Sequence, residues 1–301
     1  MIKYDIAIIG GDRRTACMAP VFLNKGYRVI CYHVQESGIK DSYIQDSCSS
    51  QNFDIPQIQY AHSLKEALEN AQIIVGGIPF TKNDCLYCES NPSEIKLCEF
   101  QRCLRKRQKV FGGVIPEDFR RICDEREISC FDYMKDEPLT LFNAISTAEG
   151  AILEALIHKD TNIHQSNTLV LGYGRCGKIL ADKLKGISAY VTIASNDDKE
   201  LSLASALGFN TLHTSQLNSK IYHFEYIFNT IPFCILNKAC LENVPKNSLI
   251  IDIASNRIGA DYDAASQLNT NIIYCPGLPG KHSSQSCAEK LVEYTINNSS
   301  I

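Results

Sequence analysis

The sequence predicts an α/β protein with two doubly wound parallel sheets joined by a long helix. Short apolar runs alternate with segments of helical periodicity along both halves, which is the pattern of β-α units around a parallel sheet. A glycine-rich turn follows the first apolar run of each half. The chain has 301 residues, of which 45% are hydrophobic and 21% charged. One hydrophobic core rarely organises so long a chain, so we expect two domains.

In the first half, apolar runs predict five strands, at residues 4–9, 28–32, 73–77, 109–115 and 128–133. Helices are expected after the first glycine turn and near residues 64–69 and 116–124. Residues 34–60 and 79–100 are polar and weakly periodic, so we expect two long loops there. Long loops in a compact α/β domain often act as functional lids.

A helix is predicted to run from Pro138 past Leu156 and to join the two halves, because proline is favoured in the first helical turn and apolar residues then recur at helical spacing. Its other side is a narrow face of small and polar residues. They are Asn143, Ser146, Thr147, Gly150 and Glu154. This face is either simply solvated or borders a cleft between the domains, and the pattern alone favours neither.

The second half repeats the rhythm with five predicted strands, at residues 168–171, 190–194, 226–230, 249–253 and 272–275. The segment 275–283 is rich in proline and glycine and is expected to be a rigid loop. A last helix is expected over residues 284–296, and it can pack back on the first domain.

The strongest motif is a Gly-x-Gly-x-x-Gly sequence directly after a strand and at the start of a helix. It comprises Gly172, Tyr173, Gly174, Arg175, Cys176 and Gly177. The first glycine permits a tight turn, the second lets the backbone approach a pyrophosphate, and the third lets the helix pack closely on the strand. The helix start adds N–H donors and positive potential. A dinucleotide site in a Rossmann-like domain is therefore favoured over a glycine turn without a phosphate ligand.

The end of the next strand bears on which dinucleotide is bound. Ser195 and Asn196 stand where an acidic residue would hold the ribose 2′-hydroxyl of NAD and repel the 2′-phosphate of NADP. Their neutral side chains favour NADP and leave NAD possible. Thr230 and Pro232 end another strand of this half, at the edge of the sheet where ligands bind in open α/β folds.

We therefore divide the chain into a substrate or partner domain and a dinucleotide-binding domain. The first comprises residues 1–137 plus about 284–301, because the last helix is expected to return to it. The second comprises residues 138–283.

Cationic residues near strand ends are candidates for binding an anionic substrate. Arg13 and Arg14 begin a helix after the first glycine turn, where guanidinium and N–H groups can bind a carboxylate or phosphate. Two ordinary surface arginines are an equally good interpretation. Arg257 follows a strand and can reach a substrate carboxylate. His282 has a side chain suited to acid–base chemistry, although a single loop histidine is more often simply exposed.

The 14 cysteines are too sparse for a disulfide-stapled scaffold, so reduced thiols are expected. Cys85, Cys88, Cys98 and Cys103 lie close together in sequence, and the first two have the Cys-x-x-Cys spacing that can chelate a metal. No histidine lies near the second pair. Free thiols are therefore favoured over a zinc or iron–sulfur site, and we predict no metal.

Charge and hydropathy exclude several classes of partner. The 30 basic and 34 acidic residues give a net charge of −4, which argues against a nucleic-acid partner. No apolar stretch in the sequence reaches the roughly 18–20 residues needed to cross a bilayer. The chain runs from Met1 into a strand and not into a signal peptide. We expect a cytoplasmic protein with no membrane partner.

Together, five segments make the chain resemble the A subunit family of dipicolinate synthase, the enzyme of spore-forming bacteria that makes pyridine-2,6-dicarboxylate. The segments are Gly-Gly-Asp-x-Arg at 10–14, Thr-Ala-Glu-Gly at 147–150, the glycine motif at 172–177, Asn-Thr-Ile-Pro at 229–232 and Pro-Gly-Leu-Pro-Gly at 276–280. The resemblance covers nearly the whole chain. The chain departs from the family pattern at 256–259 and at 281–284, which leaves the exact shape of these loops open.

The resemblance implies that a dihydrodipicolinate, formed from 4-hydroxytetrahydrodipicolinate by loss of water, gives a hydride to NADP and becomes aromatic. It also implies a role in sporulation, in the mother-cell cytoplasm, and a partner, the flavoprotein-like B subunit. A homo-oligomer is possible as well. The ring and its two carboxylates need cationic and polar groups on two sides. The candidates are Arg13, Arg14, Asn143, Thr147 and Arg257. Glu149 and His282 are the candidates that take the ring proton.

Two other functions stay open. A 2-hydroxy acid dehydrogenase shares the two-domain layout, but the acid that such an enzyme needs is missing after Asp252 and Arg257. A non-catalytic protein that binds NADP and acts as a scaffold for the flavoprotein is the other alternative. It predicts that replacing Arg257 leaves product formation unchanged.

Overall fold

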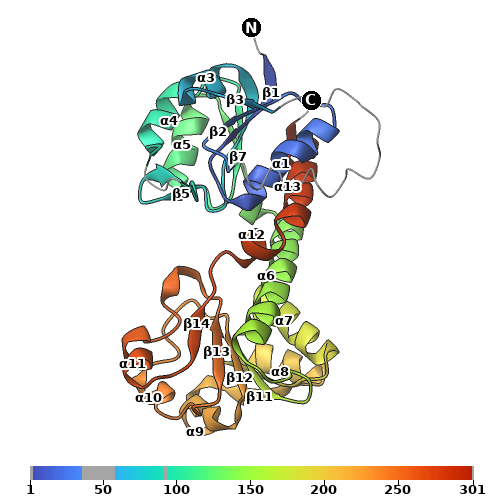
Figure 1. Ribbon diagram of the computed structural model, residues 1–301, viewed down its shortest axis with the longest axis vertical. Coiled ribbons are helices and arrows are strands. Elements are labelled where there is room, and N and C mark those ends of the chain that lie inside the picture. The colour runs from blue at the N-terminus through green and yellow to red at the C-terminus, as the bar shows by residue number, and fades with distance from the viewer. Residues whose placement is uncertain (1–2, 36–57, 91–93, 300–301) are drawn as a thin grey trace. The chain divides into compact units, whose positions relative to one another are not determined.

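The computed structural model divides into two compact units, Met1–Thr140 with Ser283–Ile301, and Leu141–His282 (Figure 1). It describes residues 3–35, 58–90 and 94–299, so most of the expected loop at 34–60 lies outside the described residues. Each unit contains one six-stranded parallel sheet with helices on both faces, which confirms the predicted fold class.

The sheet of the first unit has the order β3-β2-β1-β4-β7-β8. Its strands are β1 (Tyr4–Ile9), β2 (Val29–Tyr32), β3 (Gln59–Tyr60), β4 (Ala71–Val75), β7 (Lys109–Gly112) and β8 (Ser129–Asp132). Ile6 of the central strand pairs in parallel with Val29 on one side and with Ile73 on the other. The order therefore winds outward from β1 in both directions, as a doubly wound sheet requires.

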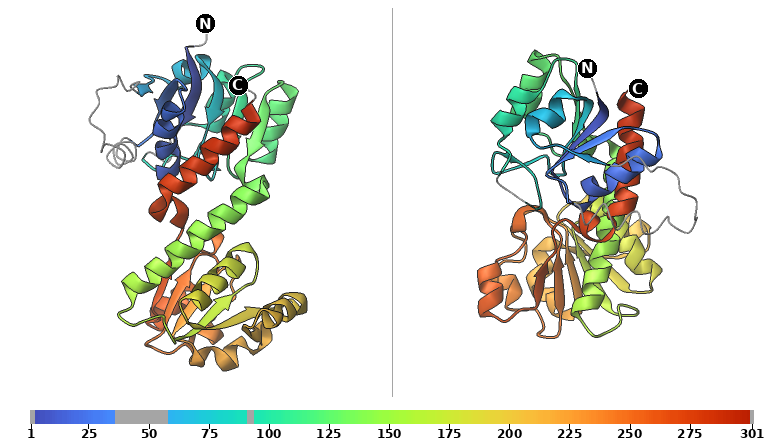
Figure 2. Two further views of the ribbon diagram at one scale, coloured as in Figure 1. Left: turned by 90° about the vertical axis from the view of Figure 1, so that its right-hand side faces the viewer. Right: turned by 45° about the horizontal axis from the view of Figure 1, so that its top comes forward.

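Helices cover both faces of this sheet. They are α1 (Arg13–Asn24), α3 (Leu64–Glu69), α4 (Leu97–Cys103), α5 (Glu117–Glu125) and α13 (Ser284–Ser299). Ile6 and Ile8 face a core shared with α1 and α13, whereas Ala7 and Ile9 face a core shared with α3, α4 and α5. Burial on both faces explains why residues 6–9 of β1 form an unbroken apolar run. The last helix packs back on the first unit, as predicted, and lies beside α1 (Figure 2).

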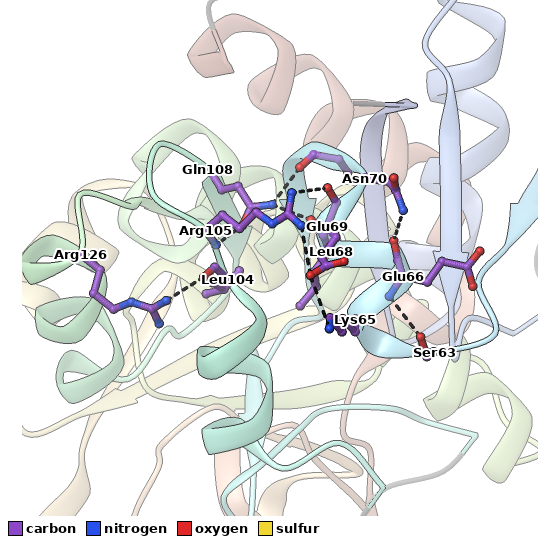
Figure 3. Close-up of polar contacts among 11 residues, drawn as sticks. Ser63, Lys65, Glu66, Leu68, Glu69, Asn70, Leu104, Arg105, Gln108 and Arg126 are labelled. Carbon is purple, nitrogen blue, oxygen red and sulfur yellow. Dashed lines mark hydrogen bonds and ion pairs between the residues drawn. The ribbon is translucent and has the colours of Figure 1, made fainter. Parts of the chain in front are cut away.

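A network of polar side chains lies at the amino-terminal end of the strands of this sheet (Figure 3). The buried Gln108 amide donates hydrogen bonds to the carbonyl oxygens of Leu68 and Ala71, at 2.6 and 2.9 Å. Arg105 donates to the Glu69 carbonyl at 3.0 Å and pairs with its carboxylate at 3.1 Å. These bonds satisfy carbonyl groups at the end of α3 and at the start of β4. The network is structural, because ligands bind at the opposite, carboxyl edge of such sheets.

The segment 79–100 is more ordered than the predicted loop. β5 (Thr81–Lys82) and β6 (Cys85–Leu86) form a short antiparallel pair, and α4 begins within the segment. Phe80 and Ile95 are buried in the second core of the unit. Two-residue strands are too short to produce a sequence period, so only the tertiary packing reveals them.

Helix α6 (Glu137–His158) contains the boundary between the two units. Leu139 belongs to a core of the first unit, and Ala148, Ala151 and Ala155 belong to a core of the second. By length and composition alone α6 is apolar enough to cross a membrane, which corrects the expectation that no segment reaches that limit. This is weak evidence for a membrane span, since a core helix meets the same criterion.

The sheet of the second unit has the order β11-β10-β9-β12-β13-β14. Its strands are β9 (Asn167–Leu171), β10 (Tyr190–Ser195), β11 (Asn210–His213), β12 (Tyr226–Asn229), β13 (Leu249–Asp252) and β14 (Ile272–Tyr274). The α-helices of this unit after α6 are α7 (Arg175–Gly186), α8 (Asp198–Ala206), α9 (Leu217–Lys220), α10 (Lys238–Leu241), α11 (Tyr262–Gln267) and α12 (Leu278–His282). The five predicted strands are present. The edge strand β11 was not predicted, because Leu212 is its only aliphatic residue.

Helix α12 replaces part of the loop predicted at 275–283. Proline and glycine disfavour helix, so propensity alone predicts a loop there. Leu278, Pro279 and Gly280 are nevertheless buried. Gly150 of α6 allows this contact, since a Cβ at that position would lie 2.9 Å from the Leu278 Cβ. Close packing against a small residue therefore fixes the helical turn that carries His282.

Candidate functional site

The turn between β9 and α7 has the geometry of a phosphate-binding cradle. Gly172 has φ +91°, in the left-handed region that favours glycine. A Cβ on Gly177 would lie 2.2 Å from the Gly172 carbonyl oxygen, so the third glycine is required for helix and turn to meet. A Cβ on Gly174, which caps α7, would meet nothing within 4 Å. The open side of the turn is thus the side from which a pyrophosphate can approach.

A pocket of about 330 Å³ lies over this turn, at the carboxyl ends of β9, β10 and β12. Its lining includes the predicted Gly172, Tyr173, Gly174, Arg175, Cys176, Ser195, Asn196, Thr230 and Pro232. Gly177 packs beneath the turn. The structure therefore brings the predicted cofactor residues together in one place, and their binding roles stay predictions.

Glu200 lines the same pocket and was not among the residues predicted from the sequence. Its carboxylate accepts a hydrogen bond of 2.6 Å from the Ser195 hydroxyl, which is itself buried. Asp197 caps α8 by accepting from the Lys199 N–H at 2.8 Å, and this places Glu200 in the first helical turn beside the end of β10. The helix cap was a usable signal for locating Glu200, because it fixes which residues begin the helix.

His282 belongs to a charge cluster around the buried Glu154 in the second unit. Its Nε2 lies 2.8 Å from the Glu154 Oε1, and the Lys281 ammonium donates to the same oxygen. Glu154 is only 2% exposed. Burial raises the pKa of Glu154, but the hydrogen bonds from Lys281 and His282 lower it by more, so the net shift is downward. The His282 ring is thus oriented by a buried carboxylate. The sequence alone favoured a simply exposed histidine, and it did not predict this contact.

Glu149 has a different environment from His282. Its side chain is 56% exposed, and its carboxylate lies 2.8 Å from the Lys183 ammonium of α7. Exposed ion pairs of this kind are usually weak, because water screens both charges. His282 thus has a buried carboxylate that fixes its ring, whereas Glu149 has only a partner near the surface. The proton-acceptor role of each stays a prediction.

The polar face of α6 is not simply solvated. Ser146 and Glu154 are 3% and 2% exposed, and Gly150 is buried. That alternative is therefore wrong for these three positions. Asn143 and Thr147 are half-buried, and the Thr147 hydroxyl donates to the Asn143 carbonyl at 2.8 Å. Their proposed contact with substrate stays a prediction.

Arg14 stabilises the first glycine turn. Its guanidinium donates to both carboxylate oxygens of Asp12, with a closest distance of 2.7 Å, and to the Ile78 carbonyl at 2.7 Å. Arg14 is 5% exposed, so this pair is buried. Asp12 also caps α1 by accepting from the Arg14 N–H. Much of the hydrogen-bonding capacity of Arg14 is used inside the unit, and substrate binding by Arg13 and Arg14 stays a prediction.

Arg257 lies on the loop after β13. Its guanidinium carbon is 4.6 Å from the Tyr262 ring centre, a cation–π contact. The buried Asp252 accepts from Asn229 and from the Ala254 N–H, each at 3.0 Å, and also from the Tyr262 hydroxyl. Burial, together with the bond to Asp252, raises the pKa of Tyr262. This network fixes the base of the loop and leaves Arg257 exposed above it.

The cysteine cluster is dispersed over different environments. Cys85 and Cys98 line one pocket of about 370 Å³, whereas Cys88 is buried against Gly10, where burial raises its pKa to about 11. Cys103 is half-buried near the end of α4. Within residues 3–35, 58–90 and 94–299, no group of three His, Cys, Asp or Glu side chains is arranged to hold a metal ion.

Replacing Glu154 with glutamine is expected to reduce stability by about 2 kcal/mol at pH 7, because a buried charged acceptor loses part of its bonding. The folded-state pKa of Glu154 lies below its usual value of 4.5. Its contribution is therefore complete above that value and is lost as the pH falls through the lowered folded pKa. Urea unfolding of both proteins from pH 7 to pH 3.5 measures the difference, which should shrink toward acid. Glu149→Gln, at an exposed pair, is the control and should change stability by under about 0.5 kcal/mol.

Parts of the chain are similar in sequence to the A subunit of dipicolinate synthase. Residues 5–134 match the family described as the N-terminal domain of the dipicolinate synthase A subunit. The A subunit of dipicolinate synthase from Bacillus subtilis is 29% identical over 171 residues, which is 57% of this chain and 58% of that protein. The matched region thus spans little more than half of that relative.

Two solved structures share the fold over the whole chain. The A subunit of dipicolinate synthase from Bacillus halodurans has a TM-score of 0.78 at 20% identity, covering 99% of this chain and 98% of that one. The corresponding dipicolinate synthase structure from Bacillus subtilis has a TM-score of 0.77 at 21% identity, covering 100% and 98%.

Proposed function

We propose that the chain belongs to the A subunit family of dipicolinate synthase, since residues 5–134 match the N-terminal domain of that subunit, and that it oxidises a dihydrodipicolinate to pyridine-2,6-dicarboxylate. The substrate forms from 4-hydroxytetrahydrodipicolinate by loss of water. It then loses a hydride from a ring carbon to a nicotinamide dinucleotide and a proton to the protein. The product ring is aromatic, which makes the step favourable.

The glycine cradle is the observation that carries this proposal. A Cβ at Gly177 in the first turn of α7 would clash with the glycine turn, and a Cβ at Gly174 would meet nothing within 4 Å, at the carboxyl edge of the sheet. The first N–H groups of α7 and the side chain of Arg175, which lines the pocket, suit a pyrophosphate. The residues present therefore fit a dinucleotide, whose nicotinamide ring supplies the hydride acceptor when it is bound.

The chain itself has to orient the substrate and accept a proton. We assign substrate carboxylates to Arg257, whose planar guanidinium matches a carboxylate, and to the polar side chains of Asn143 and Thr147. Arg13 and Arg14 are assigned to substrate or partner binding in the first unit. His282 accepts the ring proton, since Glu154 holds its Nε2 and so fixes the orientation of the ring. Glu149 is the alternative acceptor.

The setting of the reaction follows from the family. We propose a heteromer with a flavoprotein-like B subunit, in the cytoplasm of the mother cell of a sporulating bacterium. Taken alone, Ser195 and Asn196 at the neutral end of β10 favour NADP as the acceptor, and NAD is the alternative. A further alternative is a scaffold protein that binds dinucleotide without catalysis, and the last is a 2-hydroxy acid dehydrogenase.

The decisive assay mixes the purified chain, with and without the B subunit, with NAD or NADP and freshly prepared 4-hydroxytetrahydrodipicolinate. Reduced cofactor and the pyridine product should appear together. Absence of both with either cofactor, in the presence of the B subunit, would contradict the proposal. A 2-hydroxy acid that reduces the cofactor without pyridine formation would support the last alternative.

Arg257→Ala separates an enzyme from a scaffold. If Arg257 binds a substrate carboxylate, product formation by the reconstituted complex should fall about a hundredfold in kcat/KM. The control is Arg121→Ala, at an exposed arginine that pairs with Asp118 on α5, which should leave the rate unchanged. Equal rates for Arg257→Ala and the unmodified complex would favour the scaffold.

A further inference from the structure

We propose that Glu200 makes the dinucleotide site select a ribose with a free 2′-hydroxyl, so that this chain binds NAD in preference to NADP. The inference rests on the dinucleotide site proposed above and names its specificity. It differs from the preference that Ser195 and Asn196 indicate, because the neutral end of β10 is not the whole of the local surface.

The contacts of Glu200 place a carboxylate where the strand itself lacks one. Glu200 comes from the first turn of α8 and lines the pocket together with Ser195 and Asn196. The Ser195 hydroxyl donates to its Oε2 at 2.6 Å and so holds the side chain at the end of β10. A carboxylate has further acceptor positions on both oxygens, which suit the hydroxyl groups of a ribose.

The start of α8 is also poorly suited to a 2′-phosphate. A helix start normally offers its N–H groups to an anion, and two N–H groups near the start of α8 already have partners. The Asp197 N–H donates to the Ser195 hydroxyl at 3.1 Å, and the Lys199 N–H donates to the Asp197 carboxylate at 2.8 Å. A phosphate at this point would therefore compete with two formed hydrogen bonds.

The charges at this end of the pocket also disfavour a 2′-phosphate. Asp197, Asp198 and Glu200 contribute three carboxylates, against the single ammonium group of Lys199. A 2′-phosphate carries about two negative charges at neutral pH, so it would be repelled by the carboxylate in the pocket. Arg175 lines the pocket at the start of α7, where it suits the pyrophosphate that both cofactors share. The arrangement therefore rejects the phosphate that distinguishes NADP.

Titration calorimetry of the full chain with NAD and with NADP tests the inference. We expect the unmodified chain to bind NAD about tenfold more tightly than NADP, or better. Glu200→Gln keeps an acceptor for Ser195 and removes the charge, so it should strengthen NADP binding and reduce the ratio about tenfold. Asp263→Asn removes the same charge from an exposed position on α11, outside the pocket lining, and should leave the ratio unchanged.

Each result of this experiment bears on one of the two proposals. Equal or tighter binding of NADP by the unmodified chain would overturn the role of Glu200, and this result does not depend on any variant folding. An unchanged ratio in Glu200→Gln would overturn it as well. If the unmodified chain, folded by circular dichroism, binds neither dinucleotide, the proposed function itself fails.

Discussion

Gly177→Ala is expected to abolish dinucleotide binding and to destabilise the second unit by about 3 kcal/mol. The added Cβ would lie 2.2 Å from the Gly172 carbonyl oxygen, which is backbone and cannot rotate away. The start of α7 would have to move from the turn, and with it the N–H groups that face the pyrophosphate. Calorimetry with NAD measures binding, and urea unfolding measures the free energy of unfolding.

Gly186→Ala is the matched control for this substitution. Gly186 ends the same helix, and a Cβ there would meet nothing within 4 Å. Because alanine favours helix over glycine, this variant should bind normally and be equally or slightly more stable. Normal binding by Gly177→Ala would contradict the cradle, since the same added methyl group would then be harmless at both places.

His282→Ala is expected to reduce the rate of pyridine formation by about 100- to 1,000-fold, the usual contribution of a general base. The Kd for the dinucleotide should change little, because His282 does not line the cofactor pocket. Steady-state kinetics of the reconstituted complex and calorimetry of the chain measure the two effects separately. A variant with weaker cofactor binding and an unchanged rate would assign His282 to structure.

Two further variants sharpen the assignment of the proton acceptor. His164→Ala removes an exposed histidine of the same unit and should leave the rate unchanged. Glu149→Gln tests the alternative acceptor, whose side chain is 56% exposed beside Lys183. A large loss of rate in Glu149→Gln, with His282→Ala nearly normal, would reverse the assignment.

The strands and the glycine motif were predictable because their signals are local. A strand buried on both faces needs an apolar run, and β1 and β9 provide one directly before a glycine turn. The motif of Gly172 to Gly177 specifies its own backbone turn, so its residues and their arrangement follow from spacing alone. The edge strand β11 and the pair β5 and β6 lack such a period, and only their pairing with neighbours defines them.

The position of Arg14 in the sequence was compatible with two different roles. An arginine at a helix start after a glycine turn is typical of anion binding, and it is equally typical of a buried ion pair. The structure shows the pair with Asp12 and the bond to the Ile78 carbonyl, 64 residues away in sequence. No spacing rule predicts the second partner, because the contact depends on how a distant loop returns to the turn.

The two parallel α/β sheets, the long helix and the place of the glycine turn were predictable from the sequence, since each depends on periodicity or on neighbouring residues. The partners of the reactive side chains are known only from the folded structure. His282 meets Glu154 across 128 residues, and Glu200 meets Ser195 through the way α8 begins after β10. A side chain's charge and orientation depend on what packs against it in space, and sequence spacing does not encode such contacts.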